Sequence, residues 1–447
     1  MLKIYSVDEA ASTILRRDNW LEREPPPAVM EGIARVFGER LAPEAAVRRI
    51  VADVRAGGDD ALRRWTARID GVQLKEVAIP PAAMAAALES IPGELAEALR
   101  LAAERIRAFH ERQPLPSWTT TELGGRLGQR LIALQRAGVY VPGGTAPLPS
   151  SLLMSAIPAQ VAGVDEIVVT TPPGKEDGLP AAVILAAAQI AGVEKVYTVG
   201  GAQAIAAMAY GTETVPAVEK IVGPGNLFVT LAKRQVFGQV GIDGLYGPTE
   251  TVIIADEEAN ASWVAADLLA QAEHDVLATA ILLTPSPALA EAVQREAGRQ
   301  LEQLSRAEII AASLAGQGGI VLTTDLDEAA QLADAFAAEH VCLEVAEPEA
   351  LANRIQRGGC LFFGGHSYEV LGDYVAGPSH SLPTGGTARF SSGLNVLDFV
   401  RINSVVDLDQ ETATELGRAA AIIAGAEQLT AHANAAHVRA AYVRDEV

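Results

Sequence analysis

The stretch from Glu166 to Val199, EIVVTTPPGKEDGLPAAVILAAAQIAGVEKVYTV, contains one strand–helix–strand unit. Glu166–Thr170 and Lys195–Val199 are short apolar runs rich in β-branched residues, and Leu179–Ala191 between them is rich in alanine, leucine and isoleucine. Segments of these lengths in this order predict two parallel strands joined by a helical crossover. The stretch therefore indicates an α/β fold.

The same alternation continues on both sides of this unit. Strands are predicted at Gly138–Val141 and Lys220–Val222, with helices at Ser150–Ala162 and Ala202–Tyr210. A second run of strands separated by helices follows downstream; its strands are Thr251–Ala255, Thr279–Leu283, Gly319–Leu322, Val341–Val345 and Cys360–Phe363. Repeated units of this kind predict two doubly wound, Rossmann-like parallel-sheet domains, with similar patterns that suggest a duplication.

The remaining segments flank these two runs. A small helical N-terminal arm closes on Pro25–Pro27, and a polar passage around Gly124–Gly125 predicts a hairpin whose returning strand is Arg130–Leu134. The tail turns helical again and is too short for a large core, so it should dock on another surface. The expected division is an arm at 1–27, one α/β domain at 28–135 plus 248–391, a second α/β domain at 136–247, and a helical C-terminal segment at 392–447.

Composition narrows the class of protein. With 447 residues, 49% hydrophobic and 20% charged, the chain has the composition of a soluble globular protein of two or three domains. No apolar window is long enough for a membrane span, and the N-terminus lacks the apolar core of a signal peptide, so we expect a cytoplasmic protein. Cys342 and Cys360 are too few for a disulfide framework. A net charge of −21 disfavours nucleic acid and anionic membranes as partners.

Three glycine-rich turns follow predicted strands of the first run: VPGGTAP at Val141–Pro147, VGGAQA at Val199–Ala204 and VGPGN at Val222–Asn226. Glycine at such turns lets backbone N–H groups approach a phosphate at a helix N-terminus. In open parallel sheets, ligands bind outside the carboxyl ends of the strands. Taken singly, each turn is weak evidence, because glycine at a strand–helix junction usually forms only a tight turn. Together, they leave nucleotide binding and simple turn geometry as about equal alternatives.

Polar residues suited to metal binding and proton transfer are scattered along the second run. Gln271 and His274 are three residues apart at a predicted helix end, a spacing that puts both side chains on one face. Glu339 and His340 are adjacent, and an acid beside an imidazole suits proton transfer. Further polar candidates are Asp373, Glu427 and His432. Their spacing is not a metal-binding motif, but mixed N/O ligands of these types suit Zn²⁺ or a neighbouring divalent ion; the alternative is ordinary surface positions.

Several longer segments resemble one known family. They include YVPGGTAPLPSSLLM from Tyr140, the stretch from Val199 to Asn226, and IDGLYGPTETVIIADEEANASWVAADLLAQAEHD from Ile242. AEHVCLEV from Ala338, GDYVAGPSHSLPTGGTARFSS from Gly372 and AEQLTAH from Ala426 follow in the same order. These segments are similar to those of the histidinol dehydrogenase family, and the similarity runs from about residue 30 to the end.

The resemblance implies an activity and a role for each matching residue. The family oxidises L-histidinol through L-histidinaldehyde to L-histidine in two NAD-dependent steps, as the last steps of histidine biosynthesis. By this resemblance, one Zn²⁺ per subunit is bound by Gln271, His274, Asp373 and His432. His340 is implied to be the general base and Glu339 to activate water. The substrate is implied to contact Thr249 and Glu427 together with the metal ligands and His340, and NAD to contact Tyr140, Gln203 and Asn226. The resemblance also implies a homodimer whose C-terminal segment completes the active site of the neighbouring subunit.

Three departures from the family pattern bear on the substrate. Thr249 stands where the family usually has serine, Ala338 where proline usually precedes the Glu–His pair, and Ser379 where asparagine is common. An alternative is therefore a paralogous Zn- and NAD-dependent dehydrogenase of another small alcohol, such as a sulfonated propanediol. Glu427 favours an imidazole substrate because its carboxylate can accept the ring N–H, whereas a sulfonate calls for a cation.

Overall fold

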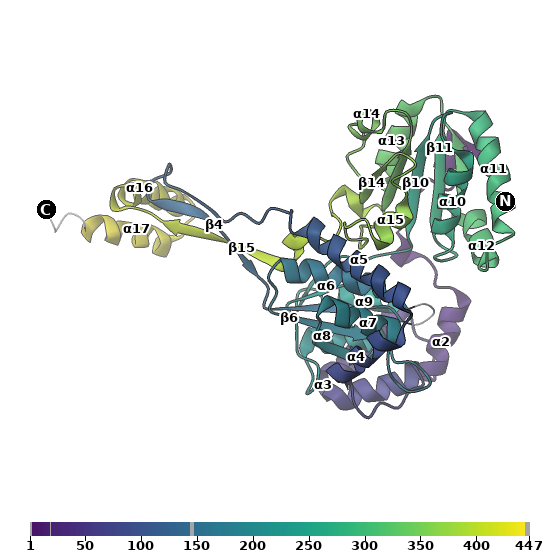
Figure 1. Cartoon of the computed structure of the whole chain (residues 1–447). Helices are drawn as coiled ribbons and strands as arrows, with labels where there is room; N and C mark the ends of the chain where they lie inside the picture. The colour runs from purple at the N-terminus through teal and green to yellow at the C-terminus, as the bar shows by residue number, and fades with distance from the viewer. Residues whose placement is uncertain (1, 18, 144–146, 443–447) are drawn as a thin grey trace. The chain divides into compact units, whose positions relative to one another are not determined.

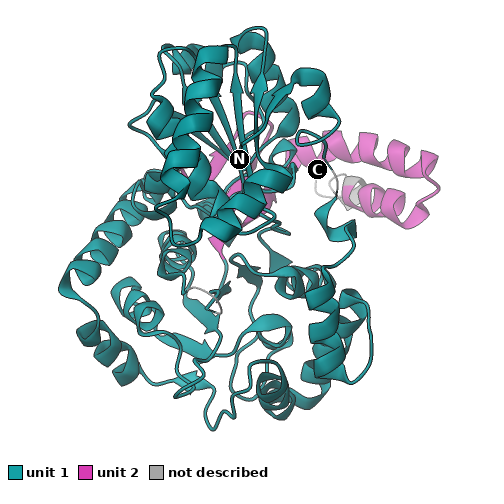
Figure 2. Ribbon diagram, turned by 90° about the vertical axis from the view of Figure 1, so that its right-hand side faces the viewer, with its two compact units in different colours: residues 1–113, 134–399 teal, residues 114–133, 400–447 magenta. Residues whose placement is uncertain are grey.

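The computed structural model describes residues 2–17, 19–143 and 147–442, with the side chains of 440–442 left out. The chain divides into two compact units (Figure 2): unit 1 comprises residues 1–113 and 134–399, and unit 2 comprises residues 114–133 and 400–447. Among the described residues, no helix is both long enough and apolar enough to cross a membrane.

Unit 1 contains a sheet, here called the β10 sheet, in which all six strands are parallel. Its order is β1-β12-β11-β10-β13-β14. The strands are β1 (Ile4–Ser6), β10 (Glu250–Ala255), β11 (Thr279–Thr284), β12 (Gly319–Leu322), β13 (His340–Glu344) and β14 (Cys360–Phe363). Chain order reverses between β10 and β13, as in a doubly wound fold. The predicted second run of strands is confirmed, and the N-terminal arm adds an edge strand to it.

Helices cover both faces of the β10 sheet (Figure 1). Apolar side chains of the strands point alternately to the two faces, so each face needs its own layer of helices. One layer is α10 (Ala261–Ala272), α11 (Pro287–Leu301) and α12 (Ala307–Gln317); the other is α1 (Val7–Ala11), α13 (Leu326–Phe336) and α14 (Pro348–Ala352). The predicted α/β class is confirmed for this part of the chain.

The second sheet of unit 1, here called the β5 sheet, has the order β2-β7-β6-β5-β8-β9. All its strands are parallel except β2, which pairs antiparallel with β7. The strands are β2 (Ala78–Ile79), β5 (Arg136–Tyr140), β6 (Glu166–Thr171), β7 (Lys195–Thr198), β8 (Lys220–Val222) and β9 (Gly241–Ile242). Strands β5–β9 are arranged in the same order as β10–β14, with the reversal between β5 and β8. The two sheets therefore share one topology.

The helices that precede the β5 sheet in sequence pack on it, and this corrects the expected domain boundaries. On one side α3 (Pro43–Ile69) packs on α8 (Gly201–Tyr210) and α9 (Leu227–Val236), and α2 (Pro27–Phe37) packs on α3. On the other side are α4 (Pro81–Ser90), α5 (Gly93–His110), α6 (Pro149–Val161) and α7 (Ala182–Ala191). Residues 28–112 therefore lie with 136–247, not with 248–391. Amphipathic helices show an apolar stripe in their sequence, but the stripe does not say which sheet it covers.

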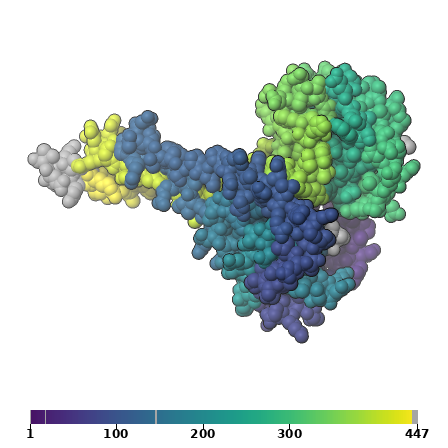
Figure 3. All heavy atoms as spheres, in the orientation of Figure 1, coloured from purple at the N-terminus to yellow at the C-terminus, as the bar shows by residue number. Residues whose placement is uncertain are grey.

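Unit 2 combines a three-stranded antiparallel sheet with two helices. The sheet order is β15-β4-β3, from β3 (Trp118–Thr120), β4 (Arg126–Ala133) and β15 (Val400–Asp407), followed by α16 (Gln410–Ala426) and α17 (Thr430–Tyr442). The predicted hairpin is confirmed, and Gly124 and Gly125 both have positive φ, at 79° and 72°. The expectation of a purely helical segment after 392 was wrong, because β15 pairs with β4. In Figure 3 these blue and yellow segments lie against each other.

Candidate active site

The Glu339–His340 pair lies where the chain enters β13. Helix α13 ends at Phe336, Ala337 adopts a left-handed conformation with φ of 53°, and three residues later the chain joins the sheet at His340. Glu339 and His340 are buried, at 7% and 3% exposure. His340 is in register with Thr251 of β10. The pair therefore sits at the amino edge of the β10 sheet, beside its topological switch point.

Glu339 is held by the segment that leads into β10. Its Oε2 accepts a hydrogen bond of 2.6 Å from the Thr249 hydroxyl and one of 3.1 Å from the backbone N–H of Glu250. Thr249 Oγ1 in turn accepts a bond of 3.0 Å from Gln271 Nε2. Burial raises the pKa of Glu339 to about 7, against the lowering effect of His340 and of these hydrogen bonds. A carboxyl group with that pKa can gain or lose a proton near neutral pH, as a general base requires.

His340 is surrounded by carboxyl groups. Its Nδ1 lies 3.8 Å from Glu369 Oε1 and 3.9 Å from Glu339 Oε2, and its Nε2 lies 3.6 Å from Asp373 Oδ1. Burial disfavours protonation of the imidazole, but Glu369, Glu339 and Asp373 outweigh it and raise the pKa of His340 above its usual value. The carboxylates thus stabilise the protonated imidazolium form of His340.

Glu369 is a residue of this site that the sequence did not reveal. It begins the short helix α15 (Glu369–Tyr374), is 2% exposed and accepts a hydrogen bond from the Thr251 hydroxyl. A glutamate in the first turn of a helix is normally explained by the helix dipole. Its burial beside an imidazole follows only from the packing of α15 on the β10 sheet, so no local pattern could have singled it out.

Three of the four predicted metal ligands lie in unit 1. Gln271 is the penultimate residue of α10 and is fully buried, and His274 and Asp373 both line a pocket of about 180 Å³. The carboxamide Oε1 of Gln271 is buried and has no hydrogen-bond partner among the described residues. The same side chain donates through Nε2 to Thr249 in the wall of that pocket, and a buried acceptor without a partner at such a place fits a cation ligand.

Asp373 is fixed by His380, another residue that sequence reasoning did not assign to the site. His380 Nδ1 lies 2.9 Å from the backbone carbonyl of Asp373, and its Nε2 lies 3.3 Å from Ser151 Oγ. Because a carbonyl only accepts, Nδ1 carries the proton of that bond. The bond holds the backbone that carries the Asp373 carboxylate.

The other two predicted residues belong to unit 2. Glu427 follows the last residue of α16 and His432 lies in the first turn of α17, and both are exposed. Across the described ranges there is no group of three or more His, Cys, Asp and Glu side chains that could hold a metal ion. Of the predicted ligands in unit 1, only His274 and Asp373 are of these residue types, because Gln271 is an amide.

The glycine turns lie at the carboxyl edge of the β5 sheet. Tyr140 ends β5, and its hydroxyl accepts a hydrogen bond of 3.2 Å from Gly201 N, at the start of α8. Gln203 is fully buried; its Nε2 donates to Asp70 at 3.3 Å, and its Oε1 is buried without a partner among the described residues. Asn226 is exposed and caps α9. In VPGGTAP, residues 144–146 lie outside the described residues.

A buried ion pair shapes the turn after β8. Lys233 and Asp243 form a salt bridge, with Lys233 Nζ 2.8 Å from the Gly223 carbonyl and the Gly223 N–H 2.7 Å from Asp243 Oδ2. Gly223 has φ of 109°, and a Cβ there would lie 2.2 Å from the Tyr140 carbonyl oxygen. Only glycine fits this close approach of two backbone segments. The turn is therefore held rigidly next to the end of β5.

The pocket is lined by residues that belong to the parts of unit 1 around both sheets. The residues that line it include Thr249, His274, Glu339, His340 and Asp373 from the side of the β10 sheet, and Ser151, Pro224 and Tyr246 from the side of the β5 sheet. A buried acid–imidazole pair in such a pocket, in a unit with two sheets of Rossmann topology, defines an α/β enzyme with an acid–base pair in its active site.

Comparison with known proteins narrows this class to one family. Residues 39–440 match the family model for histidinol dehydrogenase. The histidinol dehydrogenase of Deinococcus radiodurans is 53% identical over 416 residues, covering 93% of this chain and 94% of that protein. That of Dehalococcoides mccartyi is 50% identical over 395 residues, covering 88% and 90%. A crystal structure of histidinol dehydrogenase from Elizabethkingia anophelis matches with a TM-score of 0.88 at 32% identity, covering 99% of both chains. The chain belongs to the histidinol dehydrogenase family.

Proposed function

We propose that this protein oxidises L-histidinol to L-histidine in two NAD-dependent steps, through L-histidinaldehyde, at a single zinc site. The observation that carries the proposal is the buried Glu339–His340 pair in one pocket with His274 and Asp373. The names of the relatives support the choice of substrate. The activity belongs to histidine biosynthesis, and we place it in the cytoplasm.

In the first step His340 removes the hydroxyl proton of the alcohol. Hydride leaves a carbinol carbon readily only when its oxygen loses a proton, and a base must therefore reach that oxygen. The carboxylates of Glu369 and Glu339 near Nδ1 stabilise the imidazolium that results. NAD, when bound, supplies the acceptor for the hydride. Tyr140, Gln203 and Asn226, around the glycine turns of the β5 sheet, are the side chains we assign to the nucleotide.

In the second step Glu339 takes a proton from the water that adds to the aldehyde. Its pKa of about 7 suits this role, because the carboxylate form is populated at neutral pH and still accepts a proton. Thr249 and the Glu250 N–H hold the same carboxylate oxygen, Oε2, and this leaves Oε1 for the water. His340 then serves again as the base for the second hydride transfer. The surrounding pocket keeps the aldehyde in place between the steps.

Gln271, His274, Asp373 and His432 would hold the metal. The unpartnered Oε1 of Gln271, with the imidazole of His274 and the carboxylate of Asp373 in the pocket, would make a mixed N/O donor set that suits Zn²⁺. When bound, the ion supplies a positive charge that orients the amino and imidazole nitrogens of the substrate. One ion is expected per subunit.

His432 and Glu427 are proposed to reach the site of a second subunit in a homodimer. The support is the exposed apolar surface of unit 2, where Val406 is 68% and Ile422 75% exposed. Leu123 and Ile423, at 64% and 60%, extend it. Apolar side chains this exposed on a unit this small are typical of an interface. Glu427 would then accept the imidazole N–H of the substrate in the neighbouring site.

The test is the amount of NADH formed per L-histidinol consumed, measured before and after removal of metal with a chelator. We expect two NADH per histidinol, little free aldehyde, and loss of activity on chelation that Zn²⁺ restores. One NADH per turnover, or none, would overturn the proposal. A panel that includes a sulfonated propanediol checks the alternative substrate, for which the relatives described above give no support. Glu427→Gln should impair use of histidinol and spare an alcohol without a ring.

A further inference from the structure

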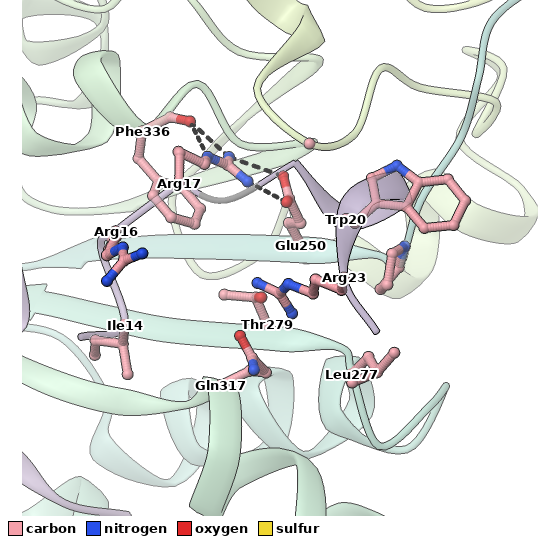
Figure 4. Close-up of a pocket in the computed structure, with 12 residues that line it drawn as sticks. Ile14, Arg16, Arg17, Trp20, Arg23, Glu250, Leu277, Thr279, Gln317 and Phe336 are labelled. Carbon is pink, nitrogen blue, oxygen red and sulfur yellow. Dashed lines mark hydrogen bonds and ion pairs between the residues drawn. The ribbon is translucent and has the colours of Figure 1, made fainter. Parts of the chain in front are cut away.

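The N-terminal arm reaches the catalytic side of the β10 sheet. It precedes residue 39, where the match to the family model begins. After β1 and α1 have docked on the sheet, the arm brings Arg17 and Trp20 to a pocket beside the start of β10 and the end of α13 (Figure 4). The contacts of these two side chains suggest a role in arranging the active site.

Arg17 bonds to the first residue of β10 and to the end of α13, two places far apart in sequence. Its guanidinium forms a two-pronged salt bridge with the Glu250 carboxylate, with Nη2 2.9 Å from Oε2. Its Nε lies 2.9 Å from the Phe336 carbonyl oxygen, and its Nη2 lies 3.3 Å from the Ala337 carbonyl oxygen. The guanidinium carbon also lies 3.5 Å from the centre of the Phe336 ring. Figure 4 shows the guanidinium between the two partners.

Both partners of Arg17 lead directly to the catalytic pair. Glu250 is the first residue of β10, and its N–H donates to Glu339. Phe336 is the last residue of α13, three positions before Glu339, and carbonyls at a helix end have no partner within the helix. One guanidinium therefore fixes the start of β10 relative to the chain that enters β13. A bidentate pair of this kind constrains orientation as well as distance.

Trp20, in the same arm, packs against the turn just before β10. A Cβ on Gly247 would lie 2.7 Å from Trp20 Nε1, so the indole lies directly on the backbone of this turn. The Gly247 N–H also donates a 2.7 Å bond to Thr384 Oγ1. Thr249, which donates to Glu339, is two residues further along the chain. The arm thus supports the segment 247–250 from two independent contacts.

We infer that Arg17 is a positioning residue of the active site, which holds the Glu250 N–H and the α13 terminus so that Glu339 is aimed at the water of the second oxidation. The inference rests on the proposed function. Arg17 is expected to affect the second oxidation more than the first. Glu339 is bonded to the segment that Arg17 holds, whereas His340 is placed by its pairing with Thr251 within the sheet and by Glu369.

The test compares Arg17→Met with Glu250→Gln, with the double variant and with Arg23→Met as the matched control. Arg23 lines the same pocket, and within the described ranges no bond joins it to Glu250 or Phe336. Two rates are measured, oxidation of L-histidinol and oxidation of supplied L-histidinaldehyde, along with NADH per histidinol and thermal unfolding.

Arg17→Met is expected to slow aldehyde oxidation roughly tenfold more than histidinol oxidation, to release free aldehyde and to bring NADH per histidinol from two towards one. Because the Met variant leaves the Glu250 carboxylate buried without its partner, Glu250→Gln in the same chain should restore part of the thermal stability and activity. Should Arg17→Met not fold, Arg17→Lys, which keeps the charge but not the fork, is expected to give the same imbalance between the steps.

Equal loss in both steps would show that Arg17 is merely structural and would overturn the inference, as would an Arg17→Met variant indistinguishable from Arg23→Met. Failure of the proposed function is distinguished by the wild-type protein, which would then not form two NADH per histidinol.

Discussion

The hydroxyl of Thr249 lies 2.6 Å from Glu339 Oε2 and donates to it. This bond stabilises the carboxylate form of Glu339 and counters the burial that raises its pKa to about 7. Threonine stands here where the resemblance predicted serine, and the hydroxyl has the same role in either residue. The effect of the hydroxyl on the pH dependence of the reaction can therefore be tested apart from the effect of the methyl group.

Thr249→Val should move the pH dependence of aldehyde oxidation upward. Without the donor the carboxylate form of Glu339 loses a hydrogen bond, so its pKa rises above about 7 by on the order of one unit. Since the carboxylate form acts as the base, the rate at pH 7 falls and the rising limb of the pH–rate profile shifts to higher pH. Thr249→Ser keeps the hydroxyl and should leave the limb in place. An unshifted limb in the Val variant would mean that Glu339 is not the group that titrates.

Glu339→Gln should separate the two oxidations. Gln cannot accept a proton from water, so aldehyde oxidation falls by roughly 10²–10⁴-fold, while the first hydride transfer continues through His340. The expected result is about one NADH per histidinol and accumulation of aldehyde, trapped with a hydrazine reagent. Equal loss of both steps, with unchanged thermal unfolding, would assign Glu339 to the first step as well.

His340→Asn and His274→Ala should differ in metal content. His340 lies among carboxylates and is proposed as the base, so its removal should lower turnover by roughly 10²–10⁴-fold with zinc retained. His274→Ala removes a proposed ligand and should lower zinc per subunit. Elemental analysis of both proteins after dialysis measures this. Zinc lost from the His340 variant would show that the imidazole is a ligand and not the base.

How much of this could be predicted from the sequence differs between the two sheets. The strands and helices of both were predictable, because their β-branched runs and alanine-rich crossovers carry local signals. The glycine turns at Gly200–Gly201 and Gly223–Gly225 lie where ligands collect in open sheets, outside the carboxyl ends of the strands. Glu339 and His340 lie at the amino edge of the other sheet, where that rule gives no guidance.

Partners distant in sequence account for most of what was missed. Arg17 and Glu250 are 233 residues apart, and nothing near either one indicates an ion pair. The packing of residues 28–112 on the β5 sheet is likewise decided by the fit of apolar surfaces, which a helical pattern does not specify. The strand β15 was missed because its partner, β4, is remote and its side chains face solvent on both sides.

His110→Leu should make the protein less sensitive to acid. His110 is fully buried in α5 and neither ring nitrogen has a partner among the described residues, so burial lowers its pKa to about 4. Between the unfolded pKa of about 6.5 and the folded pKa of about 4, the unfolded chain binds a proton that the folded chain does not, so stability decreases as the pH is lowered. The cost is about 2 kcal/mol between pH 7 and pH 5. Denaturant unfolding at these two pH values should show a smaller loss in the Leu variant; an equal loss would mean that His110 is solvated.

The proposed sharing of the site between subunits predicts complementation between two inactive variants. Gln271 lies in unit 1 and His432 in unit 2, so Gln271→Ala damages one part of the donor set and His432→Ala the other. If each site takes Gln271 from one subunit and His432 from the other, a mixed dimer holds one site with both defects and one with neither.

Random mixing after reversible dissociation makes half of the dimers mixed, and each mixed dimer has one intact site out of two. About a quarter of the wild-type activity should then return, because half of the dimers are mixed and half of the sites in each mixed dimer are intact. Tagged subunits allow the mixed dimer to be purified, in which case half of the wild-type activity and one zinc ion per dimer are expected. If ligands instead came from a single subunit, every site would contain one defect and the mixture would stay inactive, because no arrangement of the two variants could bring an intact Gln271 and an intact His432 together.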